Sequence, residues 1–206
     1  MVRTVLVLVC ILLSCQAYCQ DMVYSNLQEL LSGSGDTVTT LAREKRTLSQ
    51  IYMSGGADYH IYSTDNDSFT KYLKKRSYAV RCQDTLYVNC KQVRYKKYRF
   101  GNWFAKAAKV NGHVFFVAQP LGQIASSSLV SKDVPRLQGT VGDAINASGL
   151  VYDRVVYEIF PDGNVDFVGR DRMKQILASH TELLDEFLAQ DSESADVVMK
   201  YLMSVH

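Results

Sequence analysis

Basic and aromatic side chains gather in the middle of the chain, in a pattern suited to binding an anionic partner. Of the 23 Lys and Arg residues, twelve lie between Lys71 and Lys109, a stretch whose only acid is Asp84. The densest cluster stands just before Trp103 and consists of Lys96, Lys97 and Arg99. Positive charges beside planar rings are what a groove for anionic polymers uses. The pattern therefore predicts a binding surface formed by this cluster and Trp103.

The same stretch also has a purely structural interpretation. Most of its aromatic residues alternate with their neighbours as buried residues of strands do; they are Tyr72, Tyr78, Tyr87, Tyr95, Tyr98, Phe100, Trp103 and Phe104. The lysines are then the solvated faces of these strands. The segment 181–206 holds six acidic residues and only Lys200, and in this interpretation it folds back over the basic residues. Both interpretations are open from the sequence.

Motifs for metal binding and catalysis are missing from the sequence. Asp65-Asn66-Asp67 begins like a calcium loop, but the later ligands and the loop glycine do not follow, so a solvated loop ending in a helix cap is the better interpretation. There is no nucleophile elbow, phosphate-binding loop or dinucleotide fingerprint. Four histidines occur without metal-ligand spacing, and they are His60, His113, His180 and His206. We expect no catalytic residue, no metal and no cofactor, which favours a non-enzymatic protein.

Two cysteines lie on strands of one expected hairpin. The runs Tyr78–Cys82 and Leu86–Cys90 both alternate, and a three-residue loop, 83–85, places Val80 opposite Val88. In that register Cys82 and Cys90 are four residues out of step, roughly 13 Å, whereas a disulfide needs Cα atoms within about 7 Å. The sequence therefore predicts two buried, unbridged cysteines.

The first nineteen residues have the three parts of a secretory signal. Arg3 is the only charge before Asp21, and it precedes nine apolar residues, Val5–Leu13, and a polar stretch. The small residues before Gln20 predict cleavage between Cys19 and Gln20. The alternative is a lipobox, 12–15, in which Cys15 is lipidated and holds the protein at a membrane. Either route predicts an exported protein of the periplasm or cell envelope.

The remaining chain is expected to form one α+β domain, 20–206, and no integral membrane protein, because no other apolar run approaches the about 20 residues of a spanning helix. Its first part, 20–120, is rich in strands. Asn111-Gly112 predicts a type I′ hairpin turn, and Pro161–Asn164 predicts a second hairpin. Segment 121–150 is either a tightly packed helix or a Ser/Ala/Gly-rich connector. Segment 151–206 is a hairpin followed by C-terminal helices.

Expected shorter elements precede and follow these hairpins. Ser25 and Ser68 each begin a short helix, and strands are expected at 37–45, 49–54 and 59–63. Near the C-terminus Asp171 caps one helix and Ser194 precedes the last. Between them Ser179 and Glu182 have the spacing of a capping box.

Three motifs and a C-terminal pattern occur in a recognisable order. They are Gly55-Gly56-Ala57-Asp58-Tyr59, Leu86-Tyr87-Val88-Asn89-Cys90, Gly101-Asn102-Trp103-Phe104-Ala105, and the hairpin from Arg154 to Val168 with helices after it. Together they resemble a family of secreted Bacteroidetes proteins of unknown function, over nearly the whole chain after the leader. The resemblance implies export and an envelope location, and it implies no activity.

Two classes of function follow from these features. The first is an envelope binding module whose basic face meets lipid headgroups, lipopolysaccharide phosphates or acidic glycans; nucleic acid is a weaker candidate, because an exported protein rarely meets it. The second is a structural protein that pairs with a protein partner through segment 121–150 or the C-terminal helices. Salt separates the two classes, because screening weakens an electrostatic partner far more than apolar helix packing.

Overall fold

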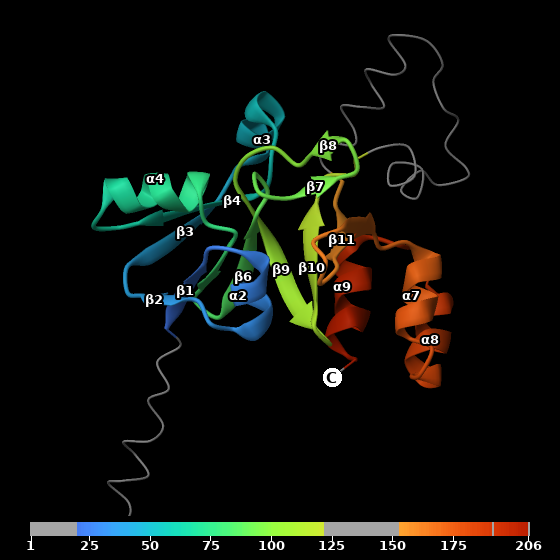
Figure 1. The fold of residues 1–206 in the computed structure, drawn as a ribbon. Coiled ribbons are helices and arrows are strands. Elements are labelled where there is room, and N and C mark those ends of the chain that lie inside the picture. Colours follow the sequence, from blue (N-terminus) through green and yellow to red (C-terminus); the bar gives the residue numbers. More distant parts are fainter. Residues whose placement is uncertain (1–19, 122–152, 191, 206) are drawn as a thin grey trace, which may run out of the picture.

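The computed structural model describes residues 20–121, 153–190 and 192–205, which form a mostly antiparallel, open β-sheet with helices on both faces (Figure 1). This arrangement confirms the predicted α+β class. The main sheet contains ten strands, β1 (Asp21–Tyr24), β2 (Asp36–Val38), β3 (Leu41–Lys45), β4 (Tyr59–Ser63), β5 (Ala79–Cys82), β6 (Thr85–Asn89), β9 (Phe104–Val110), β10 (His113–Ala118), β11 (Val155–Ile159) and β12 (Val165–Phe167).

The strand order in the main sheet is β12-β11-β10-β9-β6-β5-β1-β2. The β3–β4 hairpin joins this path through one residue pair, Tyr59 with Phe104. A separate small hairpin consists of β7 (Arg94–Tyr95) and β8 (Tyr98–Arg99). The expected strand 37–45 is thus two strands, β2 and β3, which pair with different neighbours.

Both faces of the sheet are covered, so the central strands are buried on two sides. Helix α2 (Leu27–Ser32) and the β7–β8 hairpin pack on one face. On the other face, α7 (Arg170–Ile176), α8 (Thr181–Leu188) and α9 (Ala195–Met203) pack beside β9–β11. Helix α4 (Asp67–Lys75) and the β3–β4 hairpin cover the rest of that face, beside β5 and β6. A sheet buried in this way has apolar runs in place of alternation.

Turn chemistry explains which hairpins were predicted correctly. Asn111 and Gly112 have φ of 50° and 80°, as a type I′ turn requires, and they join β9 to β10 as expected. The β11–β12 hairpin is also confirmed. The predicted register of β5 and β6 is wrong by one residue, because the turn is the two-residue pair Gln83 and Asp84, with φ of 50° and 64°.

The one-residue slip changes which face each side chain of the β5–β6 hairpin occupies. Val80 lies opposite Tyr87, not Val88. Cys82 and Cys90 are both free and buried, as predicted, and they belong to cores on opposite faces of the sheet. Burial raises the pKa of Cys82 to about 11 and also raises the pKa of Cys90. Both thiols are therefore protonated, inert core residues at neutral pH.

Helix α3 (Leu48–Ser54) replaces the strand expected at 49–54. The Thr47 hydroxyl accepts from the backbone N–H of Gln50, and the Gln50 side chain accepts from the backbone N–H of Thr47. This reciprocal capping box starts the helix. Asn26 caps α2 in place of Ser25, and Asn66 caps α4 ahead of Ser68, so the Asp65-Asn66-Asp67 loop does end in a helix cap.

The C-terminal helices follow the predicted order but begin differently. The N-cap residue of α7 is Gly169, two residues before Asp171, so Asp171 lies in the first turn and does not cap the helix. Helix α8 begins after His180 with no side-chain cap. The capping box predicted from Ser179 and Glu182 is therefore wrong. Ser194 is the N-cap residue of α9, as expected. Segment 121–150 lies outside the described residues apart from Leu121. Within the described ranges, no helix combines the length and apolar composition needed to cross a membrane.

Candidate functional site

Two of the motifs quoted from the sequence meet where β4 and β9 begin. The backbone N–H of Ala57 donates to the carbonyl of Asn102 over 2.9 Å. Gly56 has φ of 81°, and a Cβ atom there would lie 2.4 Å from the Asn102 oxygen. The third motif reaches the same place, because the N–H of Cys90 donates to the carbonyl of Trp103 over 3.0 Å. These contacts fix the position of the chain's single tryptophan.

Trp103 is half-buried, and basic groups surround its ring. The Arg46 guanidinium lies 4.9 Å and the Lys74 ammonium 4.4 Å from the ring centroid, within the range of cation–π attraction. The His60 ring meets the indole edge-on at 4.9 Å. Burial lowers the pKa of His60, and Lys74 and Arg46 lower it further, against an opposing effect of Glu44. Trp103 is thus a junction between three separate elements.

Arg46 ties α3 to this junction. Its side chain is buried, and the guanidinium donates to the carbonyls of Gln50, Gly55 and Ala57 over 2.9, 2.8 and 2.6 Å. It also donates to the Ser54 hydroxyl. Carbonyl oxygens at the end of a helix carry partial negative charge, so they stabilise this cation. Burial lowers the pKa of Arg46, while nearby Asp58 raises it.

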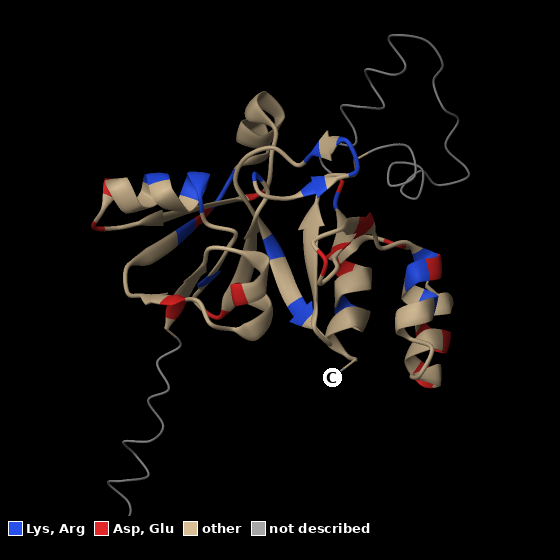
Figure 2. Ribbon diagram, in the orientation of Figure 1, with Lys and Arg blue, Asp and Glu red and all other residues tan. Residues whose placement is uncertain are grey.

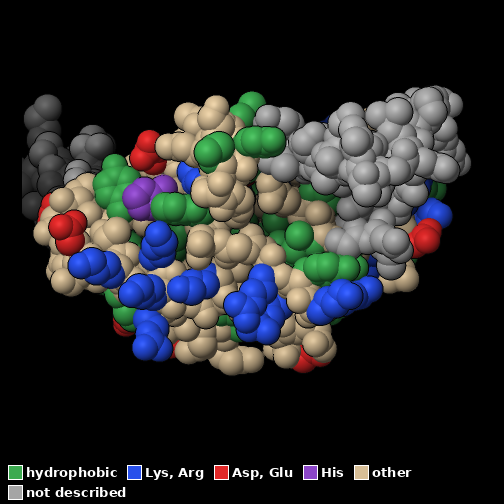
Figure 3. Space-filling view, turned by 90° about the horizontal axis from the view of Figure 1, so that it is seen from above, with side chains coloured by type: hydrophobic (Ala, Val, Ile, Leu, Met, Phe, Trp, Pro, Cys, Tyr) green, Lys and Arg blue, Asp and Glu red, His purple; other side chains and the backbone are tan. Residues whose placement is uncertain are grey.

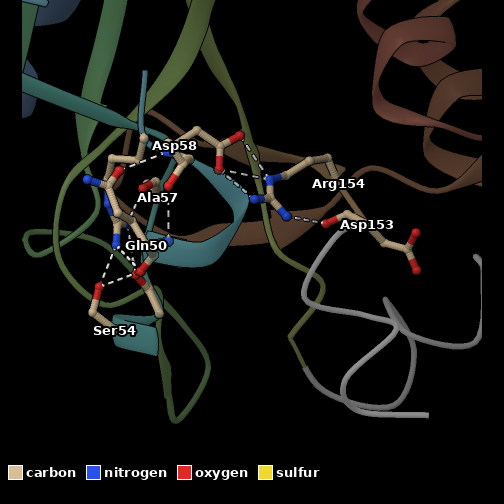
Figure 4. Close-up of polar contacts among 9 residues, drawn as sticks. Gln50, Ser54, Ala57, Asp58, Asp153 and Arg154 are labelled. Atoms are coloured by element: carbon tan, nitrogen blue, oxygen red, sulfur yellow. Dashed lines mark hydrogen bonds and ion pairs between the residues drawn. The ribbon is translucent and has the colours of Figure 1, made fainter. Parts of the chain in front are cut away.

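Beside this group, Asp58 forms an ion pair with Arg154 that joins the start of β4 to the segment before β11 (Figure 4). Both carboxylate oxygens accept from Arg154, from Nε over 3.1 and 3.0 Å and from a terminal nitrogen over 2.5 Å. The two side chains are mostly buried. Arg46 and Arg154 are therefore structural cations, held inside the protein and not presented to a partner.

The exposed basic residues lie beside this junction. We call them the basic row: Lys71, Lys74, Lys75 and Arg76 of α4 and its C-cap, Lys91, and Arg94, Lys96, Lys97 and Arg99 of the β7–β8 hairpin. Asn89 joins the two halves, since its amide donates to the carbonyls of Leu73 and Ser77 over 3.1 and 2.8 Å. Gln92 donates to the Lys75 carbonyl over 2.9 Å. Seen from above, basic side chains cross this face in a row (Figure 3).

The predicted cluster Lys96, Lys97 and Arg99 belongs to this row, but the expected strand leading into Trp103 is a hairpin. Lys96 and Lys97 form its turn, with Lys96 at φ 55°. Trp103 lies at the α4 half of the row, against Lys74. Sequence reasoning missed the contribution of α4, although Lys71, Lys74 and Lys75 recur at helical spacing after Asn66.

The basic row has no ion-pair partner among the described residues. The acidic residues of α7 and α8 lie on another part of the molecule (Figure 2), and the ion pairs found there join Arg170 to Glu193 and Lys174 to Asp171. Within the described part of the chain, the acidic segment does not cover the row. The core interpretation of the aromatic residues is confirmed for Tyr87, Tyr95, Phe100 and Phe104, which are buried.

A cleft of about 800 Å³ opens beside the hairpin half of the row. Its lining includes Arg94 and Lys96 of the hairpin, Asp162 of the β11–β12 turn and Asp166 of β12. Burial raises the pKa of Tyr78, which also lines it, to about 12. The described lining contains no His, Cys or Ser. No three His, Cys, Asp or Glu residues in the described ranges are grouped to hold a metal ion.

The comparisons with known proteins assign no activity. A family model described as "Family of unknown function (DUF6563)" matches residues 22–206. No curated protein and no solved structure matches the chain.

Proposed function

The chain belongs to this family of unknown function, and we propose that it is an exported, non-enzymatic protein that binds an anionic component of the cell envelope through the basic row. The observation that carries the proposal is the row itself, nine exposed cations with no acidic partner among the described residues. Such a concentration of one charge attracts an oppositely charged surface and raises its rate of association.

The fold supports this function because the row is built into the structure. Asn89 and Gln92 hold the two halves together, and Trp103 fixes Lys74. Like charges at short distance repel each other, so a row of cations without interspersed acids costs stability and favours contact with an anionic partner. The apolar faces of α7, α8 and α9, by contrast, pack on the sheet, so these C-terminal helices do not favour pairing with a partner protein.

The test replaces Lys96, Lys97 and Arg99 together by Glu and measures elution from a heparin resin as salt rises. The matched control, Arg81→Glu, Lys106→Glu and Lys200→Glu, changes the net charge equally at exposed residues outside the row. We expect the first variant to elute at clearly lower salt than the control. Both should melt close to the wild type, because single exposed charges contribute under about 1 kcal/mol to stability.

Two results would overturn the proposal. The first is a wild-type protein that passes through the resin at about 50 mM salt, where screening is weak. The second is an equal shift in elution for both triple variants, which would show that net charge alone, and no particular surface, is responsible.

A further inference from the structure

Helix α3 exposes apolar side chains that have no partner among the described residues. Leu48, Tyr52 and Met53 are 60%, 57% and 82% exposed, while Ile51 points inward and is 2% exposed. The helix, Leu-Ser-Gln-Ile-Tyr-Met-Ser, carries no charge. We call these three side chains the apolar tip. Large apolar side chains gathered on an exposed element mark a site of contact with another protein or with a membrane.

Hydrogen bonds fix both ends of the helix that carries the tip. The capping box of Thr47 and Gln50 fixes the first turn, and the buried Arg46 guanidinium binds carbonyls at the last turn. Gly55 then turns the chain with φ of 61°. A loop that exposed apolar residues through fraying would lack these contacts. The structure instead presents the tip at a fixed place.

The apolar tip and the basic row lie on one side of the molecule. Helix α3 stands at the top of the view between α4 and the β7–β8 hairpin, the two elements that carry the row (Figure 1). Arg46 connects them, because it binds α3 and contacts Trp103, whose ring also meets Lys74. A small hollow of about 130 Å³ is lined by Gln50 and Ser54 of α3 and by Trp103, and Glu44 is the one acid among the described residues that line it.

We infer that the anionic partner is a lipid bilayer, into whose headgroup region α3 inserts its apolar tip while the basic row contacts lipid phosphates. This inference rests on the proposed function and names its partner. Acidic glycans and free polyanions offer charge but no apolar depth, so they leave the tip in water. A bilayer offers both in one surface. Binding by apolar insertion plus basic contacts is the general mode of peripheral membrane attachment.

The experiment measures sedimentation with vesicles of phosphatidylcholine alone and of phosphatidylcholine with phosphatidylglycerol. The test variant is Leu48→Ser with Met53→Ser. The control is Leu188→Ser with Met203→Ser, two exposed apolar residues of α8 and α9, 37% and 52% exposed. We expect the wild type and the control to bind anionic vesicles alike. The test variant should bind about tenfold or more weakly, because two apolar side chains no longer leave water.

A dye reports insertion directly. In protein that begins at Gln20, a polarity-sensitive fluorophore on the Met53→Cys variant labels that position alone, because Cys82 and Cys90 are buried. Its emission should shift to the blue with anionic vesicles and be quenched by brominated lipid tails. The same dye on a Met203→Cys variant should not respond.

Failure of this inference differs from failure of the proposed function. In one outcome, the test variant binds vesicles like the wild type and the dye at position 53 stays in water, while the replacement of Lys96, Lys97 and Arg99 still weakens heparin retention. The row then binds a polyanion and the tip does not insert. If wild-type protein ignores vesicles but a protein from the same envelope protects the dye, the tip is a protein interface. Either result overturns the bilayer as partner. If the wild-type protein binds neither vesicles nor heparin, the proposed function is overturned as well.

Discussion

Gly56 is the residue at which two loops of the candidate surface come closest. Its φ of 81° and the space taken by the Asn102 carbonyl both exclude a side chain. Gly112 has nearly the same φ, 80°, but nothing lies within 4 Å of its Cβ position. The two glycines therefore separate the effect of backbone conformation from the effect of crowding.

We expect Gly56→Ala to destabilise the protein by about 2–4 kcal/mol and Gly112→Ala by about 1 kcal/mol. The first substitution adds a clash that only a movement of the Asn102 backbone relieves, and this movement also displaces Trp103. Urea denaturation of both variants measures the free energies of unfolding. Equal losses would mean that the loops separate without cost and that Trp103 is not held as the structure shows.

For single residues, the sequence showed which residue types are present but not which contacts they make in the fold. Trp103 was predicted as a binding residue, yet its ring is enclosed by Arg46, Lys74 and His60. Those contacts join residues that are 57, 29 and 43 positions away from Trp103 in the sequence, and no local pattern indicates them. The buried, unbridged cysteines were predicted correctly, although from a register that was wrong by one residue.

At the scale of elements, an ion pair attaches the C-terminal helices to the sheet. Glu158 of β11 is 1% exposed, and both its oxygens accept from Arg172 of α7, over 2.7 and 2.8 Å. His113 Nδ1 lies 2.7 Å from one of these oxygens without the alignment of a hydrogen bond. Arg172 is thus the cation that offsets the desolvation cost of the buried Glu158 carboxylate.

Arg172→Ala should destabilise the protein by about 3 kcal/mol, because it leaves a buried carboxylate without its partner. The control is Lys174→Ala, whose exposed ion pair with Asp171 on the same helix is worth under about 1 kcal/mol. Thermal or urea unfolding of both variants tests this. A loss no larger for Arg172→Ala than for the control would show that α7 is held by its apolar contacts alone.

Turns were easier to predict than the elements between them. Asn111-Gly112 specifies a turn through its own backbone preferences, so its hairpin was found from two residues. Helix α3 was mistaken for a strand because Ile51 and Tyr52 favour strands, while the capping-box spacing of Thr47 and Gln50 was overlooked. The β5–β6 register failed because Leu86, Tyr87 and Val88 are all buried, which removes the alternation that would have fixed the face.

At the scale of the whole molecule, the candidate surface is assembled from α3, α4 and the β7–β8 hairpin. The excess of basic residues in the middle of the chain could be counted from the sequence, and the prediction of an anionic partner followed from that count. The meeting of this charge with the apolar tip could not be predicted, since it depends on where β4 and β9 place α3. Figure 1 also shows that β1 lies in the lower left part of the molecule, whereas α3 stands at its top.

This geometry bears on the processing of the N-terminus. From Cys15 to the start of β1 at Asp21 the chain spans at most about 20 Å when extended. A lipid on Cys15 would therefore hold the start of β1 close to the bilayer, whereas docking through the apolar tip brings α3 to it. Docking through α3 is unconstrained when the N-terminus is free, as it is after cleavage between Cys19 and Gln20.

We therefore predict that the exported protein begins at Gln20 and carries no lipid. The measurement is the intact mass of the protein produced with its own leader and recovered from the envelope fraction. The mass of residues 20–206 should be found, and salt with a competing polyanion should release part of this protein from membranes, because the basic row contributes through screened charges. A Cys15→Ser variant, as the control, should be processed and localised like the wild type. A diacylglyceryl mass on Cys15, lost in that variant together with membrane attachment, would contradict both the cleavage site and the docking of α3 on the same bilayer.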